Sequence, residues 1–268
     1  MKIKLIAYAA LFIMVAGCSS VPITNRKQMN LLPESEVRSM AVSEYRSFLS
    51  QSKVVNNTEN SRELKSVGEK ISRGAEKYLS ENKMGDRVKN YSWEFNLIDD
   101  PTVNAWAMPG GKVVFYAGIL PVCQDENGIA VVMGHEIAHA VARHGNERMS
   151  QALAAQLGGM ALDVALSDKP EQTRQLFLSA YGVGANVAVL LPYSRLHESE
   201  ADKLGLVFMA VAGYDPREAP AFWKRMQAQS GGGSPPEFLS THPGDERRIK
   251  DLNDYMPKAL KHYAPAQQ

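Results

Sequence analysis

The sequence predicts an α+β fold that is mostly helical, with a small antiparallel sheet beside a buried helix. Alternation of period two marks a strand over Tyr91–Ile98. The turn signal Pro109-Gly110-Gly111-Lys112 then separates two further short strands. Residues 129–142, by contrast, are apolar on nearly every side, as in a buried helix. With 268 residues and 44% apolar composition, the chain can bury one large core.

Two helices are expected before the strands, over residues 31–52 and 61–81. In each of them apolar side chains recur at intervals of three or four residues, which places them on one face. The polar sequence Asn56-Asn57-Thr58 separates the two helices. These helices are expected to pack around the rest of the domain.

The second and third strands are expected at residues 105–108 and 113–116, on either side of the glycine turn. An edge strand at this place could bind an extended peptide by adding one more strand to the sheet. A hairpin that only covers the core is the alternative. The residues expected at a substrate-binding edge are Asn104, Ala105, Trp106, Pro109, Gly110 and Gly111.

Helices are expected over most of the remaining chain. Residues 151–166 and 170–191 are predicted to form two apolar helices that fill the core, cover a cleft or contact a membrane surface. A helix over 194–211 ends at Gly213, which is a typical C-terminal signal. A helix that carries Phe222, Trp223 and Met226 and a final charged helix through Leu252 complete the prediction.

The buried helix contains the sequence His135-Glu136-Ile137-Ala138-His139. Residues four apart share a helix face, so both imidazoles can bind one ion. Glu136 lies about 100° round the same helix and can act on a water molecule as a general base. A buried set of this kind is costly without a metal or other partners. The pattern therefore predicts a catalytic zinc site, with hydrogen-bonded core or surface histidines as the alternative.

A third zinc ligand is expected from another element, because catalytic zinc usually takes three protein ligands. The helix predicted over 194–211 carries three acidic residues, Glu198, Glu200 and Asp202. Glu198 and Asp202 share a face, whereas Glu200 points away. We expect Glu198 to be the ligand and Asp202 to accept an N–H from a ligand histidine and fix its tautomer. A solvated acidic face is the alternative.

The N-terminus has the pattern of an export signal. Lys2 and Lys4 precede an apolar run over residues 5–15 that is too short to span a membrane comfortably. The sequence Val15-Ala16-Gly17-Cys18 resembles the lipobox of bacterial lipoproteins, which implies cleavage before Cys18 and its acylation. By analogy with enteric lipoproteins, Ser19 indicates the periplasmic face of the outer membrane. A plain secretory signal is the alternative.

Three parts of the chain are expected on this basis. Residues 1–17 would be a lipoprotein signal peptide, residues 18–30 a tether, and residues 31–268 a single catalytic domain. The membrane would then be a partner through the lipid anchor, and the protein would reside in the bacterial cell envelope.

Charge and cysteine content argue against other functions. Thirty basic and twenty-nine acidic residues leave no net field that would attract nucleic acid, so no such partner is expected. The second cysteine, Cys123, has no disulfide partner within the mature chain if Cys18 is acylated. Its apolar neighbours predict a buried thiol rather than a nucleophile.

Three motifs together resemble the metallopeptidases of family M48, which includes HtpX-type, type I CaaX prenyl protease and Oma-type members. They are Asn104-Ala105-Trp106-Ala107-Met108-Pro109-Gly110-Gly111, the His135–His139 segment, and Glu198 followed by Asp202. The resemblance covers residues 31–251. It implies a gluzincin (zincin-like) fold and one Zn²⁺ per chain held by His135, His139 and Glu198. It also implies catalysis by Glu136 with support from Asp202.

A further segment, Ser240-Thr241-His242-Pro243, resembles one in the periplasmic members of the family. There the histidine can approach the metal and keep the enzyme latent, so His242 is a candidate regulatory residue or fourth ligand. A cap or surface histidine is the alternative. Arg143 and Arg195 lie near the metal segments and could steady an oxyanion, with structural salt bridges as the alternative.

The function that the resemblance implies is zinc-dependent hydrolysis of peptide bonds in envelope proteins, especially misfolded or misassembled ones. The alternative is a chaperone or assembly factor that binds envelope clients with little cleavage, because His242 blocks the zinc. A zinc hydrolase of non-peptide bonds is a third possibility, which the peptide-binding hairpin argues against.

Overall fold

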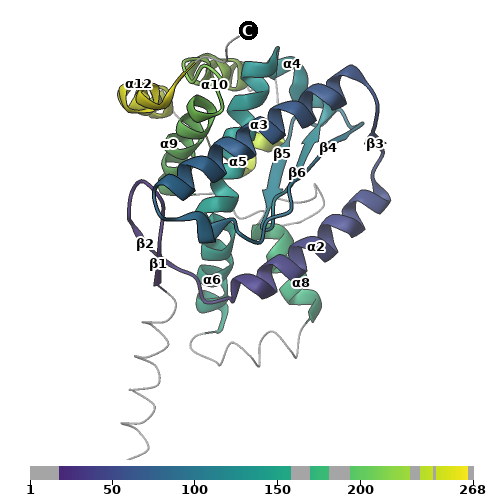
Figure 1. Ribbon diagram of the computed structural model, residues 1–268. Coiled ribbons are helices and arrows are strands. Elements are labelled where there is room, and N and C mark those ends of the chain that lie inside the picture. The colour runs from purple at the N-terminus through teal and green to yellow at the C-terminus, as the bar shows by residue number, and fades with distance from the viewer. Residues whose placement is uncertain (1–17, 158–169, 181–193, 230–235, 244–245, 265–268) are drawn as a thin grey trace, which may run out of the picture.

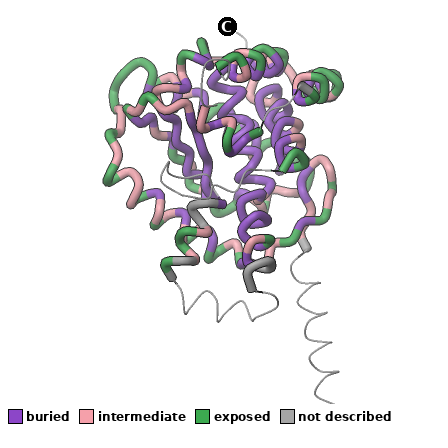
Figure 2. The backbone as a smooth tube through the Cα atoms, turned by 180° about the vertical axis from the view of Figure 1, so that it is seen from behind, coloured by how far each residue is buried: buried purple, intermediate pink, exposed green. Residues whose placement is uncertain are grey.

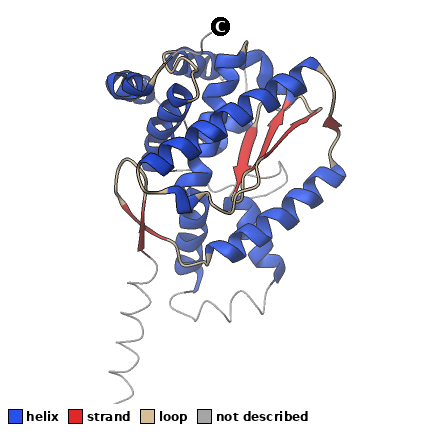
Figure 3. Ribbon diagram, in the orientation of Figure 1, coloured by secondary structure: helices blue, strands red, loops and turns tan. Residues whose placement is uncertain are grey.

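The computed structural model describes residues 18–157, 170–180, 194–229, 236–243 and 246–264. The expected signal peptide lies outside these residues, as do the ends of the two helices predicted between residues 151 and 191. Helices surround a small sheet in the described part, so the predicted α+β, mostly helical class is confirmed (Figure 3). None of these helices is both long and apolar enough to cross a membrane.

The described elements follow one another along the chain in the order given by their residue numbers. The strands are β1 (Cys18–Ser20), β2 (Lys27–Met29), β3 (Val54–Val55), β4 (Glu94–Ile98), β5 (Ala105–Met108) and β6 (Lys112–Tyr116). The N-terminal helices are α2 (Glu34–Gln51), α3 (Glu59–Glu81), α4 (Leu120–Cys123) and α5 (Glu126–Ala142). The others are α6 (His144–Leu157), α8 (Pro170–Ala180), α9 (Arg195–Val211), α10 (Glu218–Ala228), α11 (Glu237–Thr241) and α12 (Glu246–Ala259).

The larger sheet has the strand order β3-β4-β6-β5. The predicted hairpin is present, with β5 antiparallel to β6 and Ala107 opposite Val113. After β4 the chain crosses to the far edge of the sheet to form β5, and then turns back to form β6 between β5 and β4. Strand β6 therefore runs parallel to β4, and the sheet as a whole is mixed. This crossover leaves β5 at one edge of the sheet.

The sheet separates two clusters of buried side chains because its residues alternate between its two faces. Ala107 and Phe115 belong to the larger cluster, which the sheet shares with α3, α5 and α9. Trp106 and Val114 belong to the smaller cluster, shared with α2. Figure 1 shows the sheet lying between α3 and α2, and Figure 2 shows that the central helices are buried along most of their length. The buried helix α5 is thereby held against the edge strand β5.

Helices α5 and α9 approach each other closely at a pair of glycines. A Cβ atom at Gly205 of α9 would lie 3.1 Å from both the carbonyl carbon of Gly134 and the backbone nitrogen of His135. A Cβ at Gly134 would lie 3.0 Å from the carbonyl oxygen of Gly205. Because neither residue has a side chain, the two backbones pack directly against each other at the level of His135.

Local signals explain where these two helices begin and where α5 ends. The Asp125 side chain accepts the Gly128 N–H and caps α5, and Ser194 caps α9 in the same way through the His197 N–H. Arg143 has φ 61°, the left-handed conformation that ends a helix. The next helix, α6, therefore starts at once with His144, earlier than the sequence pattern predicted.

Residues 18–30, expected to be a tether, instead fold as a hairpin against the domain. Strands β1 and β2 pair antiparallel, and Val21 in their turn is fully buried in the larger core cluster. The Arg87 guanidinium donates hydrogen bonds to the backbone carbonyls of Ser20 and of Val141 in α5. The polar turn residues that suggested a tether thus close a tight hairpin, and Val21, Thr24 and Arg26 of this turn contact the domain.

Candidate metal centre

Four buried side chains from three segments meet beside the middle of α5. His135 and His139 come from successive turns of α5, Glu198 from the first turn of α9, and His242 from the residue after α11. One ligand atom from each side chain can be chosen so that all four lie within 4.8 Å of one another. The structure therefore brings together the three predicted ligands and the candidate fourth one.

The spacing within this cluster suits a tetrahedral ion. Nε2 of His135 lies 3.0 Å from Nε2 of His139 and 3.2 Å from Nδ1 of His242. Glu198 Oε1 lies 3.3 Å from His139 Nε2 and 3.0 Å from His242 Nδ1. Ligands about 2.0–2.1 Å from a tetrahedral zinc are separated by roughly 3.3 Å. Three imidazoles and one carboxylate are also typical zinc donors, so the residues fit the metal.

Asp202 lies one turn beyond Glu198 and contacts the other side of His135. Its Oδ1 is 3.0 Å from Nδ1 of His135, the distance of a hydrogen bond that the ring N–H donates. A proton held on Nδ1 leaves the lone pair of Nε2 directed at the cluster. This is the geometry that the helical spacing predicted for Asp202.

Sequence reasoning missed Arg248 of α12, which is 5% exposed. Its guanidinium donates to both oxygens of Asp202 at 2.8 and 2.7 Å, and its Nη1 lies 2.9 Å from Glu198 Oε2. The planar group also stacks over Trp223, 3.2 Å from the ring centre. Arg248 thus holds the Glu198 and Asp202 carboxylates in place. The available signal was an arginine six residues beyond His242, but it lay in a segment predicted only as a final charged helix.

Glu136 lies between the cluster and the edge strand. Its carboxylate accepts the backbone N–H of Ala107 in β5, and its Oε1 lies 3.4 Å from His242 Nε2. No described residue donates a hydrogen bond to this buried Oε1. Burial, opposed by the charge of His135, raises the pKa of Glu136 to about 8. Oε1 of Glu136 can therefore exchange a proton with a molecule placed between Glu136 and the histidines.

The charges within the cluster follow from burial and from neighbouring groups. Burial lowers the pKa of His135, but Glu198 and Asp202 outweigh burial and raise it to about 9. Burial lowers the pKa of His139 well below its usual range and that of His242 to about 4. Although burial raises the pKa of Glu198, His242 and Arg248 hold it well below its usual range. The carboxylate is therefore ionised, and in the absence of metal a proton on His135 balances it.

The predicted substrate-binding edge divides into two parts in the structure. Ala105 and Trp106 lie in the edge strand β5, with Trp106 packed in the smaller cluster. Gly110 and Gly111 instead form the turn with φ near 85°, and their carbonyls accept the N–H groups of Ser92 and Glu94. Pro109 precedes this turn at the end of β5. Only the strand itself adjoins the metal cluster.

Asn104 connects the edge strand to the segment that carries His242. Its side-chain amide donates to Glu237 of α11 at 2.9 Å, while its side-chain oxygen accepts the Ala105 N–H. The Phe238 N–H also donates to the Val103 carbonyl at 3.1 Å. Helix α11 is therefore docked on the start of β5, and this docking places His242 against the other three residues.

A cavity of about 400 Å³ adjoins the cluster between α9 and α12. Glu198, Asp202 and Arg248 form the wall that it shares with the metal centre, and Leu206 and Tyr255 add apolar surface. The exposed Arg195 also lines this cavity. Arg143, the other candidate for an oxyanion contact, pairs with Glu34 at 3.3 Å.

Cys123 is buried, and burial raises its thiol pKa, which removes nucleophilic character at neutral pH.

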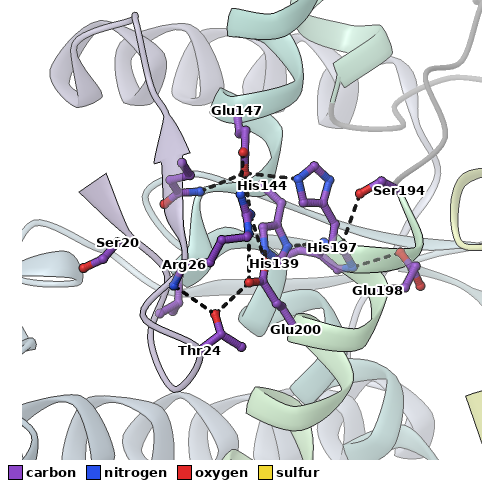
Figure 4. A network of polar contacts seen from close by, with 12 residues as sticks. Ser20, Thr24, Arg26, His139, His144, Glu147, Ser194, His197, Glu198 and Glu200 are labelled. Carbon is purple, nitrogen blue, oxygen red and sulfur yellow. Dashed lines mark hydrogen bonds and ion pairs between the residues drawn. The ribbon is translucent and has the colours of Figure 1, made fainter. Parts of the chain in front are cut away.

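Glu200, the acidic residue predicted to point away from the metal, contacts a different set of partners. It accepts hydrogen bonds from Arg26 of the N-terminal hairpin and from His144 of α6 (Figure 4). Although burial raises the pKa of Glu200, the bonds from His144, Arg26 and Thr24 lower it to about 2. Glu200 is therefore an ionised buried carboxylate outside the cluster.

A buried helix with two histidines and a glutamate, crossed by a second helix that adds an acidic residue as the third ligand, defines the gluzincin class of metallopeptidase domains. The chain belongs to Peptidase family M48, whose family model matches residues 59–256. It is 35% identical over 243 residues to mitochondrial metalloendopeptidase OMA1 of Schizosaccharomyces pombe, covering 89% of this chain and 66% of that protein.

Two further relatives come from human and from a bacterium. The chain is 32% identical over 248 residues to the human mitochondrial metalloendopeptidase OMA1, and the match covers 90% of this chain and 46% of the relative. It is 30% identical over 183 residues to the beta-barrel assembly-enhancing protease of Escherichia coli K12, and that match covers 65% of this chain and 37% of the relative. The chain thus spans between about a third and two thirds of the length of these proteins.

Proposed function

We propose that this chain is a zinc-dependent endopeptidase whose metal is held by His135, His139 and Glu198. The observation that carries the proposal is the donor cluster, whose nitrogen and oxygen atoms have the spacing of a tetrahedral zinc site. Membership of a metallopeptidase family and the names of the relatives support the same activity.

The residues of the chain then have distinct tasks. Zinc supplies Lewis-acid chemistry, because it polarises a carbonyl and lowers the pKa of water. Glu136 would take the proton of the attacking water, a task for which its position beside the cluster is suited. Asp202 holds the proton on Nδ1 of His135, and Arg248 fixes Asp202 and Glu198 in place.

The substrate would lie along the edge strand β5 in an extended conformation. The backbone N–H of Ala107 points to Glu136, so the edge strand of the described sheet and the proposed base adjoin each other. A peptide that adds a strand here brings its own backbone carbonyls next to the cluster. Recognition through the backbone tolerates many side chains, which suits unfolded proteins.

His242 would keep this site latent. Its Nδ1 takes the fourth corner of the cluster, where a catalytic zinc site keeps a position for water or substrate. Helix α11 holds it there through Phe238 N–H and the Asn104–Glu237 pair. Displacement of α11 by a substrate strand on β5 would remove His242 and open the site at the same time.

The natural setting that we propose is the bacterial cell envelope, with misfolded or misassembled envelope proteins as substrates. The beta-barrel assembly-enhancing protease of Escherichia coli and its putative counterpart in Vibrio cholerae support this setting by their names. The lipobox-like Val15-Ala16-Gly17-Cys18 supports an N-terminal lipid anchor, with the periplasmic face of the outer membrane as the expected location.

The test of the enzymatic proposal is proteolysis of an unfolded substrate such as casein. Wild type should cleave casein, a chelator should stop cleavage, and added zinc should restore it. Glu136→Gln should keep the zinc and lose the cleavage. Cleavage that continues in Glu136→Gln, or that is unaffected by chelators, would remove the proposal.

A chaperone or assembly factor is the second candidate, because the described conformation has His242 at the fourth corner of the cluster. Holding of envelope clients by β5 would then matter more than cleavage. The Glu136→Gln variant separates the two functions in cells. A defect in the envelope equal to that of a deletion supports the peptidase, whereas an unchanged phenotype supports the chaperone.

A further inference from the structure

A second buried polar cluster lies directly behind His139, on the side away from the proposed metal. It consists of His144 and Glu147 from α6, His197 and Glu200 from α9, and Arg26 from the hairpin of β1 and β2 (Figure 4). The side chains of Glu200 and His144 are completely buried. The proposed chemistry uses none of these residues.

A continuous set of contacts runs from the hairpin to the ligand His139. Arg26 Nε and Nη2 each lie 2.9 Å from an oxygen of Glu200. Glu200 Oε2 lies 3.1 Å from Nε2 of His144, and Nδ1 of His144 lies 3.0 Å from Nδ1 of His139. The far end of His139, its Nε2, is the atom in the metal cluster.

If His139 and His144 are both neutral, these contacts allow one placement of protons. A carboxylate only accepts hydrogen bonds, so Nε2 of His144 carries a proton and donates it to Glu200. A neutral His144 then has a lone pair on Nδ1, which accepts the Nδ1–H of His139. His139 in that tautomer directs the lone pair of Nε2 into the metal cluster. His144, held by Glu200, thus orients the ring of His139, as Asp202, held by Arg248, orients the ring of His135.

Arg26 completes this arrangement because its guanidinium bridges two buried carboxylates, those of Glu147 and Glu200. Its Nη1 and Nη2 each lie 2.7 Å from an oxygen of Glu147, which in turn lies 3.1 Å from His197 Nε2. The imidazole of His197 stacks on that of His144 at 4.6 Å. Without the guanidinium, two carboxylates would face each other in a buried site, and their repulsion would move them apart. That movement would displace the acceptor that orients His144.

We propose that Arg26 is a positioning residue for the metal site, and that the N-terminal hairpin orients His139 through Glu200 and His144. The inference rests on the proposed zinc site. The hairpin begins at Cys18, the expected site of acylation, so the segment nearest the membrane would also be the one that completes the ligand geometry.

The test compares Arg26→Gln with Lys27→Gln in the full-length protein. Lys27 is the neighbouring residue of β2 and is exposed, so its replacement removes the same charge from the same hairpin without touching the buried cluster. Three quantities are measured for each variant. They are the zinc dissociation constant by competition with a chromophoric chelator, the visible spectrum of the Co²⁺-loaded protein, and the thermal unfolding midpoint of the metal-free protein.

Arg26→Gln should weaken zinc binding by about tenfold and change the cobalt spectrum, since loss of a residue that orients a ligand typically costs that much affinity. Arg26→Lys should recover part of the affinity, and Lys27→Gln should behave as wild type. If Arg26→Gln lowers only the metal-free unfolding midpoint and leaves zinc affinity and the cobalt spectrum unchanged, Arg26 is merely structural and the inference is wrong.

Two further outcomes are decisive. If Arg26→Gln does not fold, Glu200→Gln replaces it, and wild-type zinc affinity in that variant overturns the inference. If wild type itself binds no zinc, the proposed function fails and the inference with it. If wild type binds zinc and the variants bind it equally well, the inference about Arg26 is wrong but the proposed function stands.

Discussion

Gly205→Ala should disturb the metal centre, although Gly205 is not a proposed ligand. The added methyl group would lie 3.1 Å from the Gly134 carbonyl carbon and the His135 nitrogen, and 3.3 Å from the Gly134 oxygen. Ordinary carbon contacts lie at about 3.5–4.0 Å, so α5 and α9 must separate by roughly 0.4 Å. These helices carry His135, His139 and Glu198, and the displacement occurs at the backbone of His135 itself.

The expected magnitudes follow from this displacement. Overpacking costs about 1–3 kcal/mol, and the better helix propensity of alanine returns about 1 kcal/mol, so the variant should be roughly 0–2 kcal/mol less stable. A 1 Å misplacement can cost about a hundredfold in rate, so a shift of this size should lower kcat/KM by roughly tenfold. Zinc affinity should fall in parallel.

Gly74→Ala is the matched control. Its methyl group would lie 2.9 Å from the Phe208 carbonyl, so it also pushes against the backbone of α9, but about three turns away from Glu198. Thermal unfolding without metal, zinc competition and hydrolysis of a fluorogenic peptide are measured for both variants. The expected result is destabilisation in both and weakened zinc binding in Gly205→Ala alone. Wild-type zinc affinity and activity in Gly205→Ala would refute the argument from helix contact.

Three further predictions concern the latch and the titrating groups. His242→Ala should keep its zinc and raise casein cleavage several-fold, because three ligands remain and the fourth corner opens; unchanged or lower cleavage counts against a latch. Glu198 and Asp202 raise the pKa of His135 to about 9 against the effect of burial, so the metal-free protein holds a proton there at pH 7. Zinc binding should release that proton, and calorimetric heats of binding should then depend on the ionisation enthalpy of the buffer; heats independent of the buffer would contradict this. The pKa of Glu200 is lowered to about 2 in the folded chain and returns to about 4.3 on unfolding, so its stabilising effect is present above pH 4.3 and is lost as pH falls through 2. Glu200→Gln should therefore lose less of its thermal stability between pH 5 and pH 3 than wild type, and equal losses would show that Glu200 contributes nothing.

Helical spacing alone predicted much of the geometry at the proposed site. His135 and His139 lie one turn apart on a helix that the apolar pattern showed to be buried. The same arithmetic separated Glu198 and Asp202, which face the cluster, from Glu200, which faces His144. Helical spacing is sufficient here because the two histidines lie in one helix and the three acidic residues lie in another.

Contacts between distant segments could not be predicted in this way. Arg248 looked like one of several charges on an exposed helix, and only the packing of α12 against α9 turns it toward Asp202. Arg26 lay in a polar segment with turn residues, which is also the composition of a tether. The position of β5 at the edge depends on the crossover after β4, which no sequence period records.

Zinc content and chelator-reversible proteolysis, measured together, decide whether this chain is a zinc-dependent peptidase. Both should be measured for wild type, Glu136→Gln and His242→Ala, so that latency does not hide activity. We expect one zinc per chain in all three proteins, and cleavage of casein that stops on chelation, returns with zinc and is absent in Glu136→Gln. Substoichiometric zinc after purification with added zinc, or casein cleavage by Glu136→Gln at the wild-type rate, would contradict this expectation.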